Sequence, residues 1–401
     1  TTASNNTAVG ASALLANTTG INNVAVGALA GDAITTGSDN TAIGTLALSS
    51  NTAATSNVAV GKDALLDFNV TSSTATYNTA VGHHAGRLVS TGVQNTLVGG
   101  LGGDALTTGS NNTVLGAFAL SADVAGNWAT AIGYNALAAL SFSSDTQHYN
   151  TAVGARAGQA VTTGINNTFV GGLAGDATDD GLENTAVGAS ALSANCGNGN
   201  SAVGHAALLQ CTGSHNVGIG GSAAWTTTDG EHNICIGTAA VTSAAGGDNQ
   251  IVMGEGVTGV GNTNFTFGNG ATDSNIAFGA TSITAPSDGR YKEEIADATA
   301  GLSFINDLRP VTFKWKKEKD LPSDHRAYVE DSETRTMNDY TNHGFIAQEV
   351  KTAIDAHSEI KDGFDMWQED ETDGRQRVGP SALVPILVKA IQEQQALIES
   401  L

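Results

Sequence analysis

The sequence predicts a mainly β protein, in which a parallel β-solenoid with rungs of about 17 residues is followed by a small α+β domain. Three observations support this prediction. A five-residue word close to Asn-Thr-Ala-Val-Gly recurs along most of the chain, glycine is abundant at 50 residues while aromatic residues make up 5%, and the charge density changes near residue 286. So few large side chains build a thin core, which suits a stack in which each rung covers its neighbour.

The closing glycine of the word sets the length of a rung. It falls at residues 10, 27, 44, 61, 82, 99, 116, 133, 154, 171, 188, 204, 220 and 237. Most steps are 17 residues, two are 16 and two are 21. The two long steps lie 72 residues apart, and the fourth residue after the closing glycine alternates between two leucines and two glycines. These patterns indicate duplication of a block of four rungs.

Each word predicts a short strand, and the Thr-Gly pairs that follow predict tight turns because glycine adopts positive φ without strain. Stacked rungs place each Asn of the word above the Asn of the next rung. Their side chains then either form a hydrogen-bonded ladder along the stack or hold the turn of their own rung. The sequence leaves both interpretations open.

The charges divide the chain into two parts. Residues 1–286 carry 16 acidic and 3 basic side chains, whereas residues 287–401 carry 23 and 14. The net charge of −22 argues against a nucleic-acid partner. Cys196, Cys211 and Cys235 are odd in number and form no CxxC pair, so no disulfide scaffold or zinc site is predicted. We interpret them as small buried residues, although a Cys196–Cys211 disulfide would join adjacent rungs.

The array over residues 1–245 resembles the head repeats of trimeric autotransporter adhesins, and similar repeats occur in phage tail-fibre proteins. This resemblance implies a left-handed parallel β-roll in which three chains associate. The rungs here are longer than those of the adhesins, so we expect larger loops. The resemblance implies a fold and no particular ligand.

Residues 246–286 follow the regular rungs. The words become more closely spaced, and Phe265, Phe267 and Phe278 replace the smaller residues of the earlier rungs. We expect this segment to be a tapering, better-packed collar that caps the solenoid, as terminal repeats must.

Residues 287–401 contain four motifs, which are Ser-Asp-Gly-Arg-Tyr-Lys-Glu-Glu-Ile from residue 287, Leu-Arg-Pro-Val-Thr-Phe-Lys-Trp from residue 308, Gly-Phe-Ile-Ala-Gln-Glu-Val from residue 344, and Leu-Val-Pro-Ile-Leu-Val-Lys-Ala-Ile-Gln-Glu from residue 383. Together they resemble the self-cleaving intramolecular chaperone domain at the C-terminus of phage endosialidases and many tail fibres. The resemblance implies that this domain trimerises, templates the folding of the fibre and then cuts the chain between Pro286 and Ser287.

The same resemblance implies that Ser287 is the nucleophile and Lys292 its general base. A hydroxyl needs a base, and lysine serves as one when burial or nearby positive charge keeps it neutral. Arg290 either depresses the pKa of Lys292 or orients the loop, and Asp288 opposes the first effect. The alternative interpretation of this segment is a solvated turn.

The final helix carries a broad apolar face, formed by Leu383, Leu387, Ala390, Leu397 and Leu401 with a second stripe at Val384, Ile391 and Ile398. Such a face suits a helix packed among three chains, and the alternative is a helix packed on its own domain.

Other candidates are weaker. His215 and His232 lie 17 residues apart and are expected to stack, while a metal site formed by three copies is the less favoured alternative. The acidic residues Glu369, Asp370, Glu371 and Asp373 are interpreted as a solvated loop, because the spacing of an EF-hand is absent. We expect no cofactor and no metal.

These features predict the distal part of a homotrimeric bacteriophage tail fibre or tailspike. We expect it to be made in the host cytoplasm, to act in the virion, to join upstream tail or baseplate proteins, and to bind a host cell-surface receptor, either a glycan or an outer-membrane component. The resemblance further implies a serine endopeptidase activity that acts once, on its own chain, and we expect no activity on an external substrate. The alternative is a bacterial trimeric surface adhesin without enzymatic activity. A hydrolase acting on a surface glycan is a third hypothesis, but the sequence contains no glycosidase-like insertion.

Overall fold

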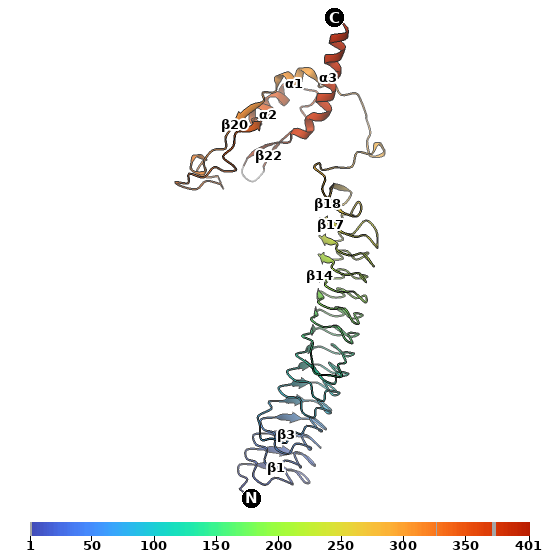
Figure 1. Ribbon diagram of the computed structural model, residues 1–401, viewed down its shortest axis with the longest axis vertical. Coiled ribbons are helices and arrows are strands. Elements are labelled where there is room, and N and C mark those ends of the chain that lie inside the picture. The colour runs from blue at the N-terminus through green and yellow to red at the C-terminus, as the bar shows by residue number, and fades with distance from the viewer. Residues whose placement is uncertain (1, 326, 371–373) are drawn as a thin grey trace. The chain divides into compact units, whose positions relative to one another are not determined.

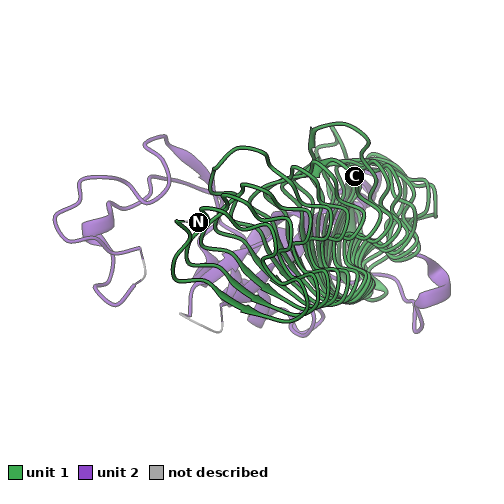
Figure 2. Ribbon diagram, turned by 90° about the horizontal axis from the view of Figure 1, so that it is seen from below, with its two compact units in different colours: residues 1–287 green, residues 288–401 purple. Residues whose placement is uncertain are grey.

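The computed structural model describes residues 2–325, 327–370 and 374–401, and the chain divides into two compact units, residues 1–287 and 288–401. Figure 1 labels the elements of both units, and Figure 2 colours unit 1 green and unit 2 purple. The acidic residues Glu371 and Asp373 lie outside the described residues. No helix in the described part of the chain has both the length and the apolar character needed to cross a membrane.

Unit 1 is a parallel β-solenoid, and Figure 2 shows its rungs lying one over another. Its strands are short, mostly of three residues. They are β1 (Thr7–Val9), β2 (Val24–Val26), β3 (Thr41–Ile43), β4 (Val58–Val60), β5 (Thr79–Val81), β6 (Thr96–Val98), β7 (Thr113–Leu115), β8 (Gly126–Asn127), β9 (Thr130–Ile132), β10 (Thr146–Gln147), β11 (Thr151–Val153), β12 (Thr168–Val170), β13 (Thr185–Val187), β14 (Ser201–Val203), β15 (Val217–Ile219), β16 (Ile234–Ile236), β17 (Gln250–Met253), β18 (Asn264–Asn269) and β19 (Thr272–Ala277). The predicted mainly β solenoid is confirmed.

The register of the strands follows the spacing of the words. Thr7 of β1 pairs with Val24 of β2, and across the first long step Val58 of β4 pairs with Thr79 of β5. The additional residues of each long step therefore lie in a loop and leave the strand register unchanged. In the second block the loop contains β10, which pairs in parallel with β8 of the preceding rung, and in the first block the equivalent pair is the Thr55–Ala75 bridge.

The core of unit 1 is built largely from small residues. The central residue of almost every strand is buried and is usually Ala, as in β2 and β5, while the residues on either side face outward. The alternation of leucine and glycine keeps this core filled. A Cβ atom on Gly86 would lie 2.5 Å from the Leu97 side chain, and one on Gly175 would lie 2.5 Å from the Phe169 ring. Rungs with a large strand residue therefore need glycine at the neighbouring position, because protein interiors leave little unfilled volume.

The asparagine column combines both predicted roles. Asn95 is fully buried, and its Oδ1 accepts the backbone N–H of Asn112 in the next rung at 3.0 Å. Its Nδ2 donates to the carbonyl oxygen of Gly109, in the turn that follows, at 2.9 Å. Each side chain thus links successive rungs and also holds a turn.

The closing glycines are required by close approach between rungs. Gly99 has φ of +140°, and a Cβ atom there would lie 2.3 Å from the carbonyl oxygen of Gly116 in the next rung. Only glycine fits such a position without displacing the backbone of the neighbouring rung.

The end of unit 1 differs from the collar expected. β17 and β18 pair in parallel, but β18 and β19 form an antiparallel hairpin, so the last word turns back and adds no further rung. Phe265 and Phe267 are partly buried, with ring centroids 5.0 Å apart, and Phe278 is 50% exposed. The phenylalanines are therefore not packed more tightly within a single chain than the earlier core residues.

Unit 2 contains helices and short strands around a small core. Its elements are η1 (Gly289–Tyr291), α1 (Leu302–Asp307), β20 (Val311–Phe313), η2 (Glu318–Asp320), β21 (Asn342–Gly344), α2 (Ala347–Ala356), β22 (Trp367–Glu369), β23 (Gln376–Val378), η3 (Pro380–Ala382) and α3 (Leu383–Glu399). Strands β20 and β21 pair antiparallel, as do β22 and β23. Phe304 of α1, Val350 and Ile354 of α2, and Leu383 and Ile386 of α3 are buried together.

Candidate functional site

The predicted cleavage segment lies on the surface. Residues 281–299 are exposed, and they include Pro286, Ser287, Asp288, Arg290 and Lys292. Asp288 caps the short helix η1 by accepting the backbone N–H of Arg290 at 2.9 Å. The backbone N–H of Lys292 donates to the carbonyl oxygen of Gly289 at 3.2 Å and ends the turn. The segment therefore has a defined local structure.

Within this turn Arg290 pairs with Asp288. The Arg290 Nε atom donates to both carboxylate oxygens of Asp288, at 3.1 and 3.0 Å. This hydrogen bonding lowers the pKa of Asp288 and raises that of Arg290. Because the guanidinium group is paired with a carboxylate of the same turn, the geometry favours a role for Arg290 in orienting the turn. The catalytic roles of Ser287 and Lys292 stay predictions.

Helix α3 uses one side for its own unit and leaves another side exposed. Leu383, Ile386 and Ala390 are buried. Apolar side chains on the rest of the helix are exposed, with Val384 at 58% and Ile391 at 64%, and further exposed apolar side chains at Leu387, Val388, Leu397 and Ile398. Packing on its own domain therefore accounts for only part of the apolar surface predicted for this helix.

Two predictions about unit 1 are confirmed. The rings of His215 and His232 stack, with centroids 5.1 Å apart and an interplanar angle of 7°. Cys196, Cys211 and Cys235 are buried free thiols, so the Cys196–Cys211 disulfide is not formed. Among the described residues no group of three or more His, Cys, Asp or Glu side chains has the geometry to hold a metal ion.

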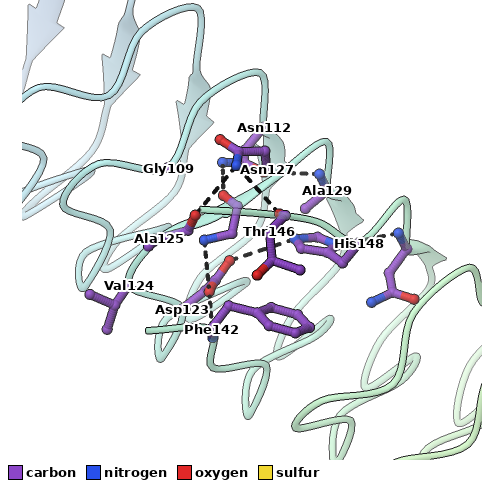
Figure 3. A network of polar contacts seen from close by, with 12 residues as sticks. Gly109, Asn112, Asp123, Val124, Ala125, Asn127, Ala129, Phe142, Thr146 and His148 are labelled. Carbon is purple, nitrogen blue, oxygen red and sulfur yellow. Dashed lines mark hydrogen bonds and ion pairs between the residues drawn. The ribbon is translucent and has the colours of Figure 1, made fainter. Parts of the chain in front are cut away.

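Sequence reasoning missed a buried pair of ionisable residues, drawn in Figure 3. The Asp123 and His148 side chains are completely buried, and His148 Nε2 lies 3.7 Å from Asp123 Oδ2. Oδ1 of the same carboxylate accepts the backbone N–H groups of Gly126 and Phe142. The His148 ring also stacks on Phe142, with centroids 5.3 Å apart.

This pair compensates for a break in the asparagine column. Ala129 occupies the position that Asn holds in the other regular rungs, so it offers no acceptor to the backbone N–H of Asn150. His148 Nδ1 accepts this N–H instead, at 3.3 Å. In the neutral ring Nε2 then carries the proton and faces the carboxylate of Asp123. Because the pair is sealed from solvent, it has a structural role. The signal that would have revealed it is the altered word at residues 129–133.

A second missed cluster lies on the surface. Trp128 and Tyr149 are 47% and 52% exposed, and their rings stack with centroids 6.3 Å apart. They occupy the residue before the column position in successive rungs, where many other rungs carry small polar residues. Large aromatic residues at this exposed position in two successive rungs would have revealed them.

Comparison with known proteins identifies one family. Residues 287–358 match the model of the Peptidase_S74 family, described as chaperone of endosialidase. No curated protein and no solved structure shows significant similarity to this chain. The matched segment begins at Ser287, contains the turn capped by Asp288, and extends through helix α2. The C-terminal part of this chain therefore carries a chaperone domain of the endosialidase type.

Proposed function

We propose that this chain is the distal part of a bacteriophage tail fibre or tailspike that binds the host surface, and that its C-terminal domain templates the homotrimer and then releases itself by cutting before Ser287. The observation that carries the proposal is the match to the endosialidase chaperone family, which begins at Ser287. A chaperone domain of this type implies homotrimer assembly, and a solenoid ahead of it fits a fibre or spike. The proposal places the mature protein in the virion.

The solenoid explains why a template is needed. Its strands have three residues in most rungs and repeat almost the same sequence, so a shift by one whole rung preserves most side-chain contacts. Parallel pairing between chain segments far apart in sequence is also slow to form. A trimer that forms first at the C-terminal end would align the three chains and set the register from there.

Helix α3 supplies a surface for that trimer. Its exposed apolar side chains, including Val384, Leu387 and Ile391, would be buried against the same helix of two further chains. Burial of a large aliphatic side chain contributes about 1.5–3 kcal/mol, so several per chain provide a substantial driving force for association.

The proposed cleavage uses the chain's own groups. Lys292 Nζ takes the proton of the Ser287 hydroxyl, and Oγ adds to the carbonyl carbon of Pro286. The bond from that carbon to the Ser287 nitrogen breaks, and the nitrogen leaves as an amine that takes the proton from Lys292. Water then hydrolyses the ester between Pro286 and Oγ of Ser287. Each chain reacts once, because the reaction consumes its own peptide bond.

Expression of a shortened gene tests the templating role. A gene that ends after Pro286 should give aggregates or monomers, whereas the full chain should give trimers by light scattering. The Ser287→Ala chain is the matched control, since it keeps the template attached and should also trimerise. Soluble, correctly folded trimers from the shortened gene would contradict the proposal.

A further inference from the structure

The side of the solenoid in the second four-rung block contains a groove of about 430 Å³. Its lining includes Asn111, Asn127, Trp128, Asp145 and Gln147. Tyr149 adjoins it, since its ring stacks on Trp128 and its hydroxyl donates to Gln147 Oε1 at 2.6 Å. We propose that this groove binds a neutral glycan. The inference rests on the proposed function and adds the location of the receptor site and the chemical class of its ligand.

The aromatic pair is placed at a conformational cost. Trp128 and Tyr149 have φ of +65° and +49°, in the left-handed region. Asn111 and Asn166 occupy the same position in neighbouring rungs with φ of +60° and +61°. Asparagine tolerates this conformation, whereas bulky side chains adopt it rarely. The conformation itself belongs to the rung, since Tyr77 and His215 hold the same position with φ of +53° and +60°. An exposed tryptophan there gains little from burial, so folding alone does not explain its presence.

The duplicated block provides an internal comparison. Seventy-two residues earlier, the positions of Trp128, Asp145 and Gln147 are held by Ser56, Ser73 and Ala75. The backbone is equivalent, because Thr55 bridges to Ala75 as Asn127 of β8 pairs with Gln147 of β10. The rung fold therefore forms without the three larger side chains. The second block has added an aromatic ring, a carboxylate and an amide, all lining one groove.

These side chains match the chemistry of a sugar. One face of a pyranose ring presents C–H groups that pack on an exposed aromatic ring, and its hydroxyl groups donate to carboxylate and amide oxygens. Asp145 already accepts a hydrogen bond from Asn127 Nδ2, which holds the carboxylate in the groove. An apolar partner would remove water from this carboxylate and the neighbouring amides without replacing the hydrogen bonds that water makes to them.

The charge distribution selects a neutral ligand. Asp145 is the charged side chain in the groove lining, and the sequence contains no Lys or Arg between Arg87 and Arg156. A sugar that carries a carboxylate or sulfate group would meet a like charge with no cation to offset it. We therefore expect the groove to favour neutral hexoses and N-acetylhexosamines over sialylated or uronic-acid glycans.

The experiment measures binding of the full chain to a glycan array of neutral, sialylated and uronic-acid oligosaccharides. The variant Trp128→Ser/Asp145→Ser/Gln147→Ala carries the residues of the first block, so the fold accepts it. Trp128→Asn places the residue of the neighbouring rungs on the same backbone. Trp225→Ala removes a tryptophan of similar exposure, 40%, outside the groove and is the matched control. Melting temperature and trimer content verify that each variant is folded.

The expected result is binding of at least one neutral oligosaccharide by the parent chain and by Trp225→Ala. Both groove variants should lose about tenfold or more in affinity, since buried aromatic contacts dominate such interfaces. Three results would overturn the site: no binding to neutral glycans, preference for acidic glycans, or equal affinity in the triple variant.

Adsorption to host cells separates this inference from the proposed function. If the triple variant adsorbs to cells as well as the parent trimer does, the groove is not the receptor site, and the fibre function is unaffected. A chain that binds neutral glycans through Trp128 but neither trimerises nor cleaves itself would support the groove and contradict the fibre function.

Discussion

At the residue scale, a few positions in each rung decide whether the chain can stack. The closing glycine could be identified from the sequence because it ends the recurring word. The structure gives the reason for it, since only glycine fits beside the carbonyl of the next rung. The position four residues later was harder to interpret. Leu65 holds it with φ of +50° and Gly86 with φ of +57°, so leucine there accepts an unfavourable backbone to fill the core. Sequence patterns reveal the alternation but not the shared conformation, because propensity alone would exclude leucine.

The three buried thiols provide a prediction at this scale. Burial raises the pKa of Cys211 and of Cys235 to about 12 and also raises that of Cys196. Thiolate is the reactive form, so the folded chain should hardly react with an aromatic disulfide reagent at mildly alkaline pH. After denaturation three thiols per chain should react. Rapid reaction of any of them in the folded chain would contradict this burial.

At the element scale, the asparagine column supports a second prediction. Asn95→Ala leaves the buried N–H of Asn112 and the carbonyl of Gly109 without partners. Each such loss costs about 1–3 kcal/mol, so the free energy of local opening, measured by native-state hydrogen exchange, should fall by about 2–4 kcal/mol in these rungs. Thr96→Ala, which changes an outward-facing residue of the same rung, should have little effect. Equal protection in both variants would show that the column contributes little.

The column also shows how far the sequence predicts the structure. The recurrence of Asn predicted either a ladder between rungs or a turn within a rung, and both occur. The amide oxygen accepts a backbone N–H of the next rung, and the amide nitrogen donates to a carbonyl oxygen of the turn. The His148–Asp123 pair and the groove at Trp128 were not predicted. Each depends on side chains from different rungs that meet only after stacking, with Asp123 and His148 25 residues apart. The antiparallel hairpin after β17 was likewise hidden, since its words resemble those of the parallel rungs.

At the scale of the whole molecule, the stability of unit 2 should depend on pH. His357 contacts Asp307 and Glu359 through its two ring nitrogens, at 2.8 and 3.0 Å, and these hydrogen bonds raise its pKa. The stabilisation is complete below the unfolded-state pKa of about 6.5 and is lost as the pH rises through the higher folded-state pKa.

Unit 2 should therefore unfold more readily at mildly alkaline than at mildly acidic pH. The described helices all lie in unit 2, so helical circular dichroism during denaturant titration follows its unfolding. His357→Gln should reduce the difference between the two pH values. If the pH dependence of unfolding is the same in this variant as in the parent chain, other ionisable groups cause it.

The measurement that tests the central claim most directly is the intact mass of the freshly folded chain. The parent chain and the control Ser303→Ala, which alters an exposed serine of α1, should yield two pieces, residues 1–286 and residues 287–401. Ser287→Ala should remain whole while still forming trimers. Lys292→Arg should also remain whole, because arginine keeps the positive charge but cannot act as a base. Cleavage before residue 287 in Ser287→Ala at the rate of the parent chain would contradict self-cleavage by Ser287.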